Sequence, residues 1–241
     1  MGQNILITGV SKGLGLKTVE VLLEKGLNIY GISRTKSPEV ELLLEQHQNS
    51  FFWQKFDLSN ADGIKNLFQS FIGFDKPIHG FVNNAAIAYD DIITNLNYHH
   101  LSKMYQINVF SPMMLTKSVI RQMLLHNING SIVHISSISV HTGYKGLSMY
   151  ASTKGAIEAF SRNTSREWGE KGIRSNCIVA GFMETEMSST LSSEKKQRIY
   201  QRTSLKKPTT VGSVAEMISF LLSDACESIT GQNIHVDSGT I

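Results

Sequence analysis

The stretch Thr8-Gly9-Val10-Ser11-Lys12-Gly13-Leu14-Gly15 decides how this chain folds. It sets three glycines in the pattern G-x-x-x-G-x-G between an apolar run at 4–8 and an amphipathic run at 14–25. The first run is typical of a buried strand, and the second has the periodicity of a helix. Glycines permit a tight turn and a close approach of the backbone to a ligand, and the N–H groups of a helix's first turn attract anions. The stretch therefore predicts a strand–turn–helix unit that cradles a pyrophosphate group.

Short apolar runs and amphipathic stretches alternate along the rest of the chain. We expect further strands at 28–33, 51–56, 78–83, 131–136, 174–179 and 233–236, and further helices at 39–47, 61–71, 102–125, 149–170 and 211–222. Strands that alternate with helices indicate a parallel sheet covered on both faces. The sequence thus predicts one α/β domain over 1–241, a Rossmann-type doubly wound sheet of about seven strands.

One segment, 183–208, interrupts this alternation. It is polar and rich in Met, Ser and Lys. We interpret it as a mobile lid over the substrate, within the same domain.

The overall composition excludes several classes of protein. With 241 residues, of which 41% are hydrophobic and 18% charged, the chain can build an ordinary core. Its net charge of +3 comes from scattered Lys and Arg, so no nucleic-acid partner is expected. No apolar run approaches the roughly 18 residues that a membrane span requires. Two cysteines are too few for a disulfide framework, and the histidines have no partners at metal-binding spacing, so we expect no metal site. We also expect a cytoplasmic protein.

A second motif lies in the predicted helix 149–170. Tyr150 and Lys154 are four residues apart, so both side chains lie on one helix face. A free Tyr has a pKa near 10, about three units too high for acid–base chemistry at neutral pH. An ammonium group about 4 Å away supplies an interaction of that size. We therefore expect Lys154 to lower the pKa of Tyr150, which would act as a proton donor.

Together these motifs resemble the short-chain dehydrogenase/reductase family, which has Thr-Gly-x-x-x-Gly-x-Gly in its first turn. Further segments follow in the family's order, namely Asp57-Leu58, Asn83-Asn84-Ala85-Ala86, Asn108, Ile229-Thr230-Gly231-Gln232 and Val236-Asp237-Ser238-Gly239. The pattern is most similar to that of 3-oxoacyl-[acyl-carrier-protein] reductases. It departs from the family at Ala86, where Gly is usual, and at Ala180-Gly181, where Pro-Gly is usual.

The resemblance implies a catalytic set for hydride transfer to a ketone. Tyr150 would give its proton to the developing alkoxide, and Ser137 would hydrogen-bond the substrate carbonyl. Lys154 would also hold the nicotinamide ribose, and Asn108 would anchor a water in the proton path. The implied cofactor-binding residues are Gly9, Ser11, Lys12, Gly13, Leu14, Gly15, Arg34, Asp57, Leu58, Asn84, Ala85, Tyr150, Lys154, Gly181, Met183 and Thr185.

The end of the predicted strand 28–33 indicates which coenzyme is used. Enzymes that use NAD place Asp or Glu there to bind the ribose 2′-hydroxyl. This chain has Ser33 at that position, followed by Arg34, which can clamp a 2′-phosphate. Lys12 adds a second cation in the glycine-rich turn. We therefore expect NADP(H) in preference to NAD(H).

The sequence leaves three functions open. The first is an NADPH-dependent 3-oxoacyl-(acyl-carrier-protein) reductase, although the turn 126–129, where the family often has basic residues for the acidic carrier, is uncharged and only Lys171 remains. The second is a ketoreductase or dehydrogenase of a sugar, polyol or other small alcohol. The third is a non-catalytic cofactor-binding sensor or scaffold, against which Ser137, Tyr150 and Lys154 argue. The expected substrate is a small-molecule or acyl-thioester carbonyl compound.

The two long helices also predict self-association. Family members commonly pair these helices across a two-fold axis. Here 102–125 and 149–170 carry apolar residues on more than one face, including Met113, Met114, Leu124, Leu125, Ile157 and Phe160. We expect a homotetramer, with a homodimer as the alternative.

Overall fold

A computed structural model describes residues 2–188 and 191–241 of the chain. The predicted lid 183–208 is therefore covered except for residues 189 and 190, which lie outside the described part.

The described residues form one sheet of seven parallel strands in the order β3-β2-β1-β4-β5-β6-β7. The strands are β1 (Asn4–Thr8), β2 (Asn28–Ser33), β3 (Phe51–Lys55), β4 (Gly80–Asn83), β5 (Ser131–Ser137), β6 (Arg174–Ala180) and β7 (Asn233–Val236). This confirms the predicted Rossmann-type sheet. The central strands are buried on both faces because helices cover both sides, which explains their continuous apolar sequences.

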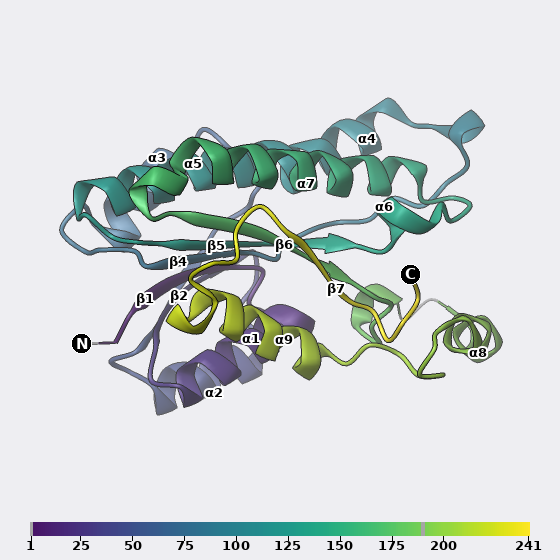
Figure 1. Ribbon diagram of the computed structural model, residues 1–241, viewed down its shortest axis with the longest axis horizontal. Helices are drawn as coiled ribbons and strands as arrows, with labels where there is room; N and C mark the ends of the chain where they lie inside the picture. The colour runs from purple at the N-terminus through teal and green to yellow at the C-terminus, as the bar shows by residue number, and fades with distance from the viewer. Residues whose placement is uncertain (1, 189–190) are drawn as a thin grey trace.

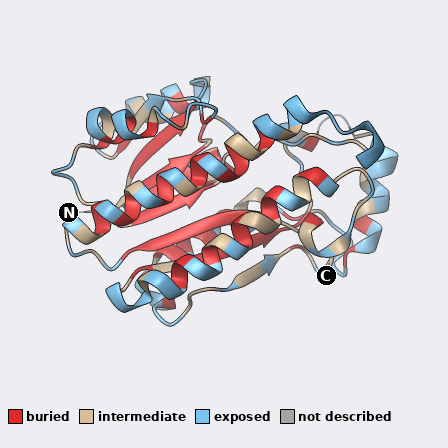
Figure 2. Ribbon diagram, turned by 90° about the horizontal axis from the view of Figure 1, so that it is seen from above, coloured by how far each residue is buried: buried red, intermediate tan, exposed pale blue. Residues whose placement is uncertain are grey.

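Helices cover the two faces of the sheet in two layers (Figure 1). On one face lie α1 (Gly13–Glu24), α2 (Pro38–Gln46) and α9 (Val211–Leu222). On the other lie α3 (Ile64–Leu67), α4 (Tyr98–Tyr105), α5 (Ser111–Leu125) and α7 (Ser148–Trp168). Two apolar cores result, one between the sheet and each layer. Figure 2 shows the consequence, since buried and exposed positions alternate along the covering helices.

The long helix predicted at 102–125 begins earlier than expected and changes its winding. Asn97 caps α4, because its side chain accepts a hydrogen bond from the N–H of His100. A π-helical turn, Gln106–Phe110, then joins α4 to α5. Such turns are frequent at functional sites.

Two short helices were not predicted. One is α6 (Ser139–Thr142), which follows β5 directly, and the other is α8 (Ser193–Arg202), within the predicted lid. Ser192 caps α8 by accepting a hydrogen bond from the N–H of Lys195. Only Tyr200 of this helix is buried, so its sequence lacks the apolar periodicity on which a prediction depends.

Across the described residues, no helix combines the length and the apolar character that a membrane span requires.

Candidate active site

A cavity of about 650 Å³ opens at the carboxyl ends of the strands. Its position follows from the topology, because the strand order reverses beside β1 and the connections from β1 and β4 diverge there. All sixteen cofactor-binding residues predicted from the sequence line this one cavity, as does Ser137. The fold thus brings together residues that are spread from 9 to 185 in the chain.

The glycine-rich turn between β1 and α1 has the conformation that its sequence predicts. Gly9 and Gly13 have φ angles of +75° and +58°, in the left-handed region that favours glycine. A Cβ on Gly15 would lie 2.1 Å from the carbonyl oxygen of Gly9, so no larger residue fits there. No side chain caps α1 and its first turn has no acid, so its amide groups at the cavity remain suited to an anion.

Hydrogen bonds hold this turn against the end of β4. Thr8 Oγ1 accepts from the backbone N–H groups of Asn84 and Ala85, at 3.0 and 2.9 Å. The side-chain amide of Asn84 donates to the carbonyl oxygens of Thr8 and Gly9, at 2.9 and 3.2 Å. These four hydrogen bonds join the connection after β1 to the connection after β4, where the two diverge.

Both cations expected to select the coenzyme line the cavity. Arg34 is exposed and lines the cavity just beyond β2. Ser33 offers no charge there, since its hydroxyl accepts from Trp53 Nε1 and donates to the carbonyl of Thr35, both at 2.8 Å. The Lys12 ammonium pairs with the Glu186 carboxylate at the start of the predicted lid.

The same cavity brings Ser137, Tyr150 and Lys154 together. Ser137 ends β5, and the other two lie one turn apart on α7. Lys154 is 4% exposed and its ammonium donates to the carbonyl of Ile135 at 2.7 Å. Burial lowers its pKa to about 8.

Tyr150 differs from the expectation. Its pKa is raised, chiefly by burial and further by the negative charge of Asp90, whereas the sequence predicted that Lys154 would lower it. The reason is geometric, because the Lys154 ammonium turns to Ile135 and lies 5.7 Å from the centre of the Tyr150 ring. The phenol is therefore protonated at neutral pH, but it is a weaker proton donor than the sequence predicts.

Comparison with known proteins agrees with this geometry. A family model described as enoyl-(acyl carrier protein) reductase matches residues 9–240. The chain belongs to the short-chain dehydrogenase/reductase family.

Individual relatives match over nearly the whole length. A 3-oxoacyl-[acyl-carrier-protein] reductase of Chlamydia pneumoniae is 30% identical over 241 residues, covering 99% of this chain and 97% of the relative. Carbonyl reductase [NADPH] 2 of Sus scrofa is 30% identical over 240 residues, covering 99% and 96%. The solved structure of ElxO with NADP bound superposes with a TM-score of 0.89 at 25% identity, covering 100% of this chain and 99% of that one.

Asn108, the fourth residue that the short-chain dehydrogenase/reductase pattern singles out, lies behind the cavity rather than in its wall. It is 2% exposed, in the π-helical turn. Its side chain bonds both backbone groups of Ile87, at 2.9 and 2.8 Å, and donates to Thr153 Oγ1 at 3.1 Å. Asn108 therefore fixes the loop after β4 to α7, and its part in a proton path remains a prediction.

Several cavity residues were not predicted from the sequence. They include the apolar residues Ile87, Leu147, Phe182, Leu191 and Ile199 and the polar residues Asp90, Tyr144, Lys145 and Arg202. They come from loops and from α8, where no periodic pattern marks them. Burial raises the pKa of Asp90. In residues 2–188 and 191–241 no cluster of three His, Cys, Asp or Glu is arranged to hold a metal ion.

Proposed function

We propose that the protein is a cytoplasmic, homotetrameric reductase that uses NADPH to convert a 3-oxoacyl thioester to the 3-hydroxyacyl thioester. The observation that carries this proposal is the cavity itself. It is lined by a phosphate cradle and two cations, Arg34 and Lys12, as well as by Ser137, Tyr150 and Lys154.

The residues present fit an NADP coenzyme. Gly15 permits the close packing of this turn, because a Cβ there would lie 2.1 Å from the Gly9 carbonyl oxygen, and the amide groups at the start of α1 would bind a pyrophosphate. Arg34 and Lys12 would hold the 2′-phosphate. Lys154 would hold the nicotinamide ribose, while Met183 and Thr185 would contact the carboxamide.

NADPH supplies the hydride that reduces the carbonyl carbon. Ser137 donates a hydrogen bond to the carbonyl oxygen and so stabilises the negative charge that develops there. Tyr150 transfers its proton to that oxygen, which completes the alcohol. The phenol of Tyr150 is protonated at neutral pH, which is the form that gives up the proton in reduction.

Two features of the chain support an acyl thioester as the substrate. The walls beside Ser137 are mainly apolar and suit an acyl chain.

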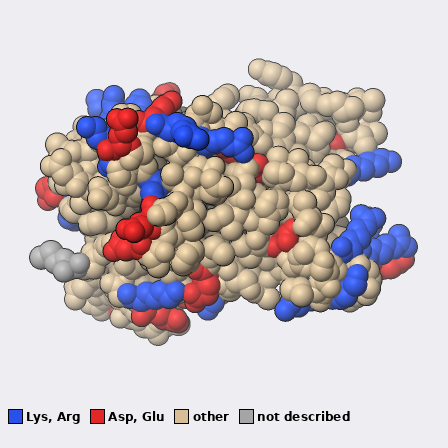
Figure 3. All heavy atoms as spheres, in the orientation of Figure 1, with Lys and Arg blue, Asp and Glu red and all other residues tan. Residues whose placement is uncertain are grey.

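Residues 193–207 contain six Lys or Arg and one Glu, although the whole chain has a net charge of only +3. Figure 3 shows Lys and Arg side chains gathered at the end of the molecule where α8 lies. Because Ile199 and Arg202 of α8 also line the cavity, an acidic carrier protein on this surface would stand at its entrance.

A substrate panel tests the proposal. Purified protein and NADPH are assayed with 3-oxoacyl groups on carrier protein, on coenzyme A and on a short pantetheine analogue, and with keto-sugars. We expect kcat/KM for the thioesters to exceed that for keto-sugars by about tenfold or more. No turnover of any thioester would contradict the proposal.

Charge reversal tests the carrier. The variant Lys195→Glu/Lys207→Glu should raise KM for the carrier-bound substrate by about tenfold and leave KM for the short analogue unchanged. The matched control is Lys65→Glu, an exposed lysine on α3. If both variants raise this KM equally, the basic segment 193–207 does not bind the carrier.

A ketoreductase of small alcohols is the second candidate, and Asp90 favours it. Its carboxylate lies in the cavity wall close enough to influence Tyr150, where it could accept hydrogen bonds from substrate hydroxyls. Asp90→Asn should then reduce kcat/KM for a keto-sugar and not for a thioester. The same panel separates the two functions.

A further inference from the structure

A buried carboxylate lies on the helix that carries Tyr150 and Lys154. Glu158 follows them at intervals of four residues on α7, so all three occupy one helix face. Glu158 is only 6% exposed. Burying a carboxylate is costly unless hydrogen bonds compensate, so its partners indicate what it does.

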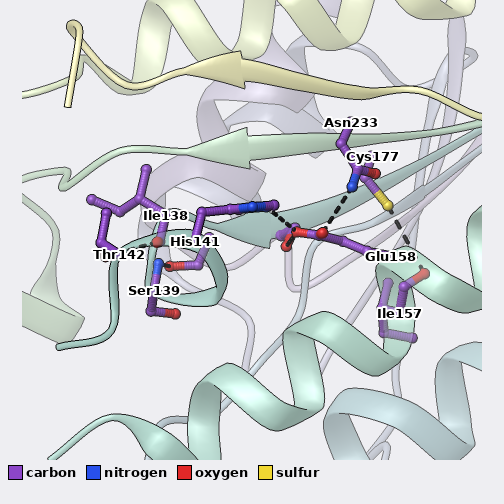
Figure 4. A network of polar contacts seen from close by, with 10 residues as sticks. Ile138, Ser139, His141, Thr142, Ile157, Glu158, Cys177 and Asn233 are labelled. Carbon is purple, nitrogen blue, oxygen red and sulfur yellow. Dashed lines mark hydrogen bonds and ion pairs between the residues drawn. The ribbon is translucent and has the colours of Figure 1, made fainter. Parts of the chain in front are cut away.

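Three donors from three different elements meet at Glu158. Ser136 at the end of β5 donates its hydroxyl to Oε1 at 2.5 Å, and Asn233 of β7 donates to Oε2 at 2.8 Å. Nε2 of His141 in α6 lies 3.2 Å from Oε1. Figure 4 shows His141 and Asn233 directed at the carboxylate from either side.

Two of these partners flank the catalytic serine. Ser136 directly precedes Ser137 and His141 follows it by four residues, and both contact the same oxygen, Oε1. Holding the Ser136 side chain against α7 fixes the backbone at the end of β5, and therefore the position of the next residue, Ser137. The N–H of Ser139 donates to Ser137 Oγ at 3.2 Å, which closes the turn between the two anchored residues.

We infer that Glu158 is a positioning residue for Ser137. Its side chain does not line the cavity. It attaches the turn that holds Ser137 to the helix that holds Tyr150, and so sets the distance between the hydrogen-bond donor and the proton donor. This inference rests on the proposed role of Ser137 in carbonyl reduction.

The test is a double-mutant cycle with Ser137. Glu158→Ala should lower kcat for reduction by roughly 10- to 100-fold, because a displacement of about 1 Å at a reacting group has an effect of that size. In a Ser137→Ala background the same change should lower kcat by less than about twofold, since there is no hydroxyl left to position. The Kd for NADPH, measured by fluorescence, should change by less than about twofold in both backgrounds.

Two further variants separate positioning from general stability. Glu158→Gln should keep kcat within about threefold of wild type, because its amide oxygen can still accept from Ser136 and His141, while the Asn233 amide can rotate to present its oxygen. Ser161→Ala is the matched control. It removes the buried hydrogen bond of 2.8 Å that Ser161, on the same helix, makes with Ser175 of β6, and should leave kcat unchanged.

The outcomes are distinct. Equal losses from Glu158→Ala in the wild-type and Ser137→Ala backgrounds would overturn the inference, as would an equal loss of kcat in Ser161→Ala. If Glu158→Ala does not fold, Ser136→Ala takes its place in the cycle with the same expectation for kcat. A wild-type protein that reduces no carbonyl compound would instead contradict the proposed function.

Discussion

The Lys154 ammonium donates to the carbonyl oxygen of Ile135 at 2.7 Å, which joins α7 to β5 two residues before Ser137. The lysine is almost completely buried, so its charged form loses hydration. Burial accordingly lowers its pKa from 10.5 to about 8, while Cys177 has a smaller opposing effect. In the proposed function Lys154 binds the coenzyme, so the loss of its charge near pH 8 should be visible in the pH dependence of the kinetics.

We expect kcat/KM for NADPH to fall as the pH rises through about 8. Below this pH the charged Lys154 would bind the ribose hydroxyls as proposed, and above it the neutral amine would bind them more weakly. Because kcat/KM reports ionisations of the free enzyme, steady-state assays from about pH 6 to about pH 10 measure this directly. Lys154→Arg should be less active but lose the alkaline decline, since Arg stays protonated throughout. A wild-type profile that stays flat to pH 10 would contradict this assignment.

Tyr150→Phe should abolish reduction and preserve coenzyme binding. The phenyl ring fills the same space but has no proton to give to the alkoxide, and proton transfer of this kind contributes about 10²- to 10⁴-fold to the rate. Turnover is followed by NADPH absorbance and binding by fluorescence. Tyr144→Phe is the matched control, because it removes a hydroxyl from another tyrosine of the same cavity. Near-normal kcat in Tyr150→Phe would show that another group is the acid.

The sequence predicted those parts of the fold and site that are encoded locally. Strand β2 and helix α9 have the predicted bounds, 28–33 and 211–222, because turn-forming residues border their apolar patterns. The glycine turn and the Tyr150–Lys154 pair are short motifs whose geometry follows from spacing alone. All sixteen predicted cofactor-binding residues meet in one cavity, because parallel strands bring their carboxyl ends to one edge of the sheet.

Features that depend on distant packing could not be predicted. Glu158 has the same spacing from Lys154 as Lys154 has from Tyr150, yet its partners Ser136, His141 and Asn233 become neighbours only through tertiary structure. The pKa of Tyr150 depends on burial and on Asp90, neither of which its own motif contains. The prediction that Lys154, on the same helix face, lowers the pKa of Tyr150 was therefore wrong.

The exposed surface of α5 and of the π-helical turn before it predicts self-association. Phe110 and Met114 are 50% and 37% exposed, whereas Ile157, which the sequence also suggested for an interface, is 1% exposed and belongs to the core. Phe110→Glu should therefore convert a homo-oligomer to monomers, because a charge would be buried in the interface. Light scattering at micromolar concentration measures this. Leu42→Glu on α2, an equally exposed position at 53%, is the control and should not change the mass. A wild-type protein that is already monomeric would refute the prediction.

The preference for NADPH over NADH should depend on Arg34. Arg34 lines the cavity just beyond β2. The position where NAD enzymes have an acid is held here by Ser33, whose hydroxyl is hydrogen-bonded to Trp53 and to the carbonyl of Thr35. A charge-assisted hydrogen bond contributes roughly 1.5–3 kcal/mol, so its loss corresponds to roughly a 10- to 100-fold change in affinity. Arg34→Asp should lower the ratio of kcat/KM for NADPH to that for NADH by at least that factor, because the carboxylate also repels the 2′-phosphate and accepts the 2′-hydroxyl of NADH.

Two neighbouring lysines make this measurement specific. Lys36 lies two residues further on, but it stacks over Trp53 and is absent from the cavity wall, so Lys36→Asp should leave the coenzyme ratio unchanged. Lys12 lines the cavity and pairs with Glu186, which competes with a phosphate for the ammonium. Lys12→Ala should therefore lower the ratio less than Arg34→Asp does. If wild type uses NADH as well as NADPH, the assignment of the coenzyme fails. If Arg34→Asp and Lys36→Asp change the ratio equally, the effect is one of general charge, and Arg34 does not hold the 2′-phosphate.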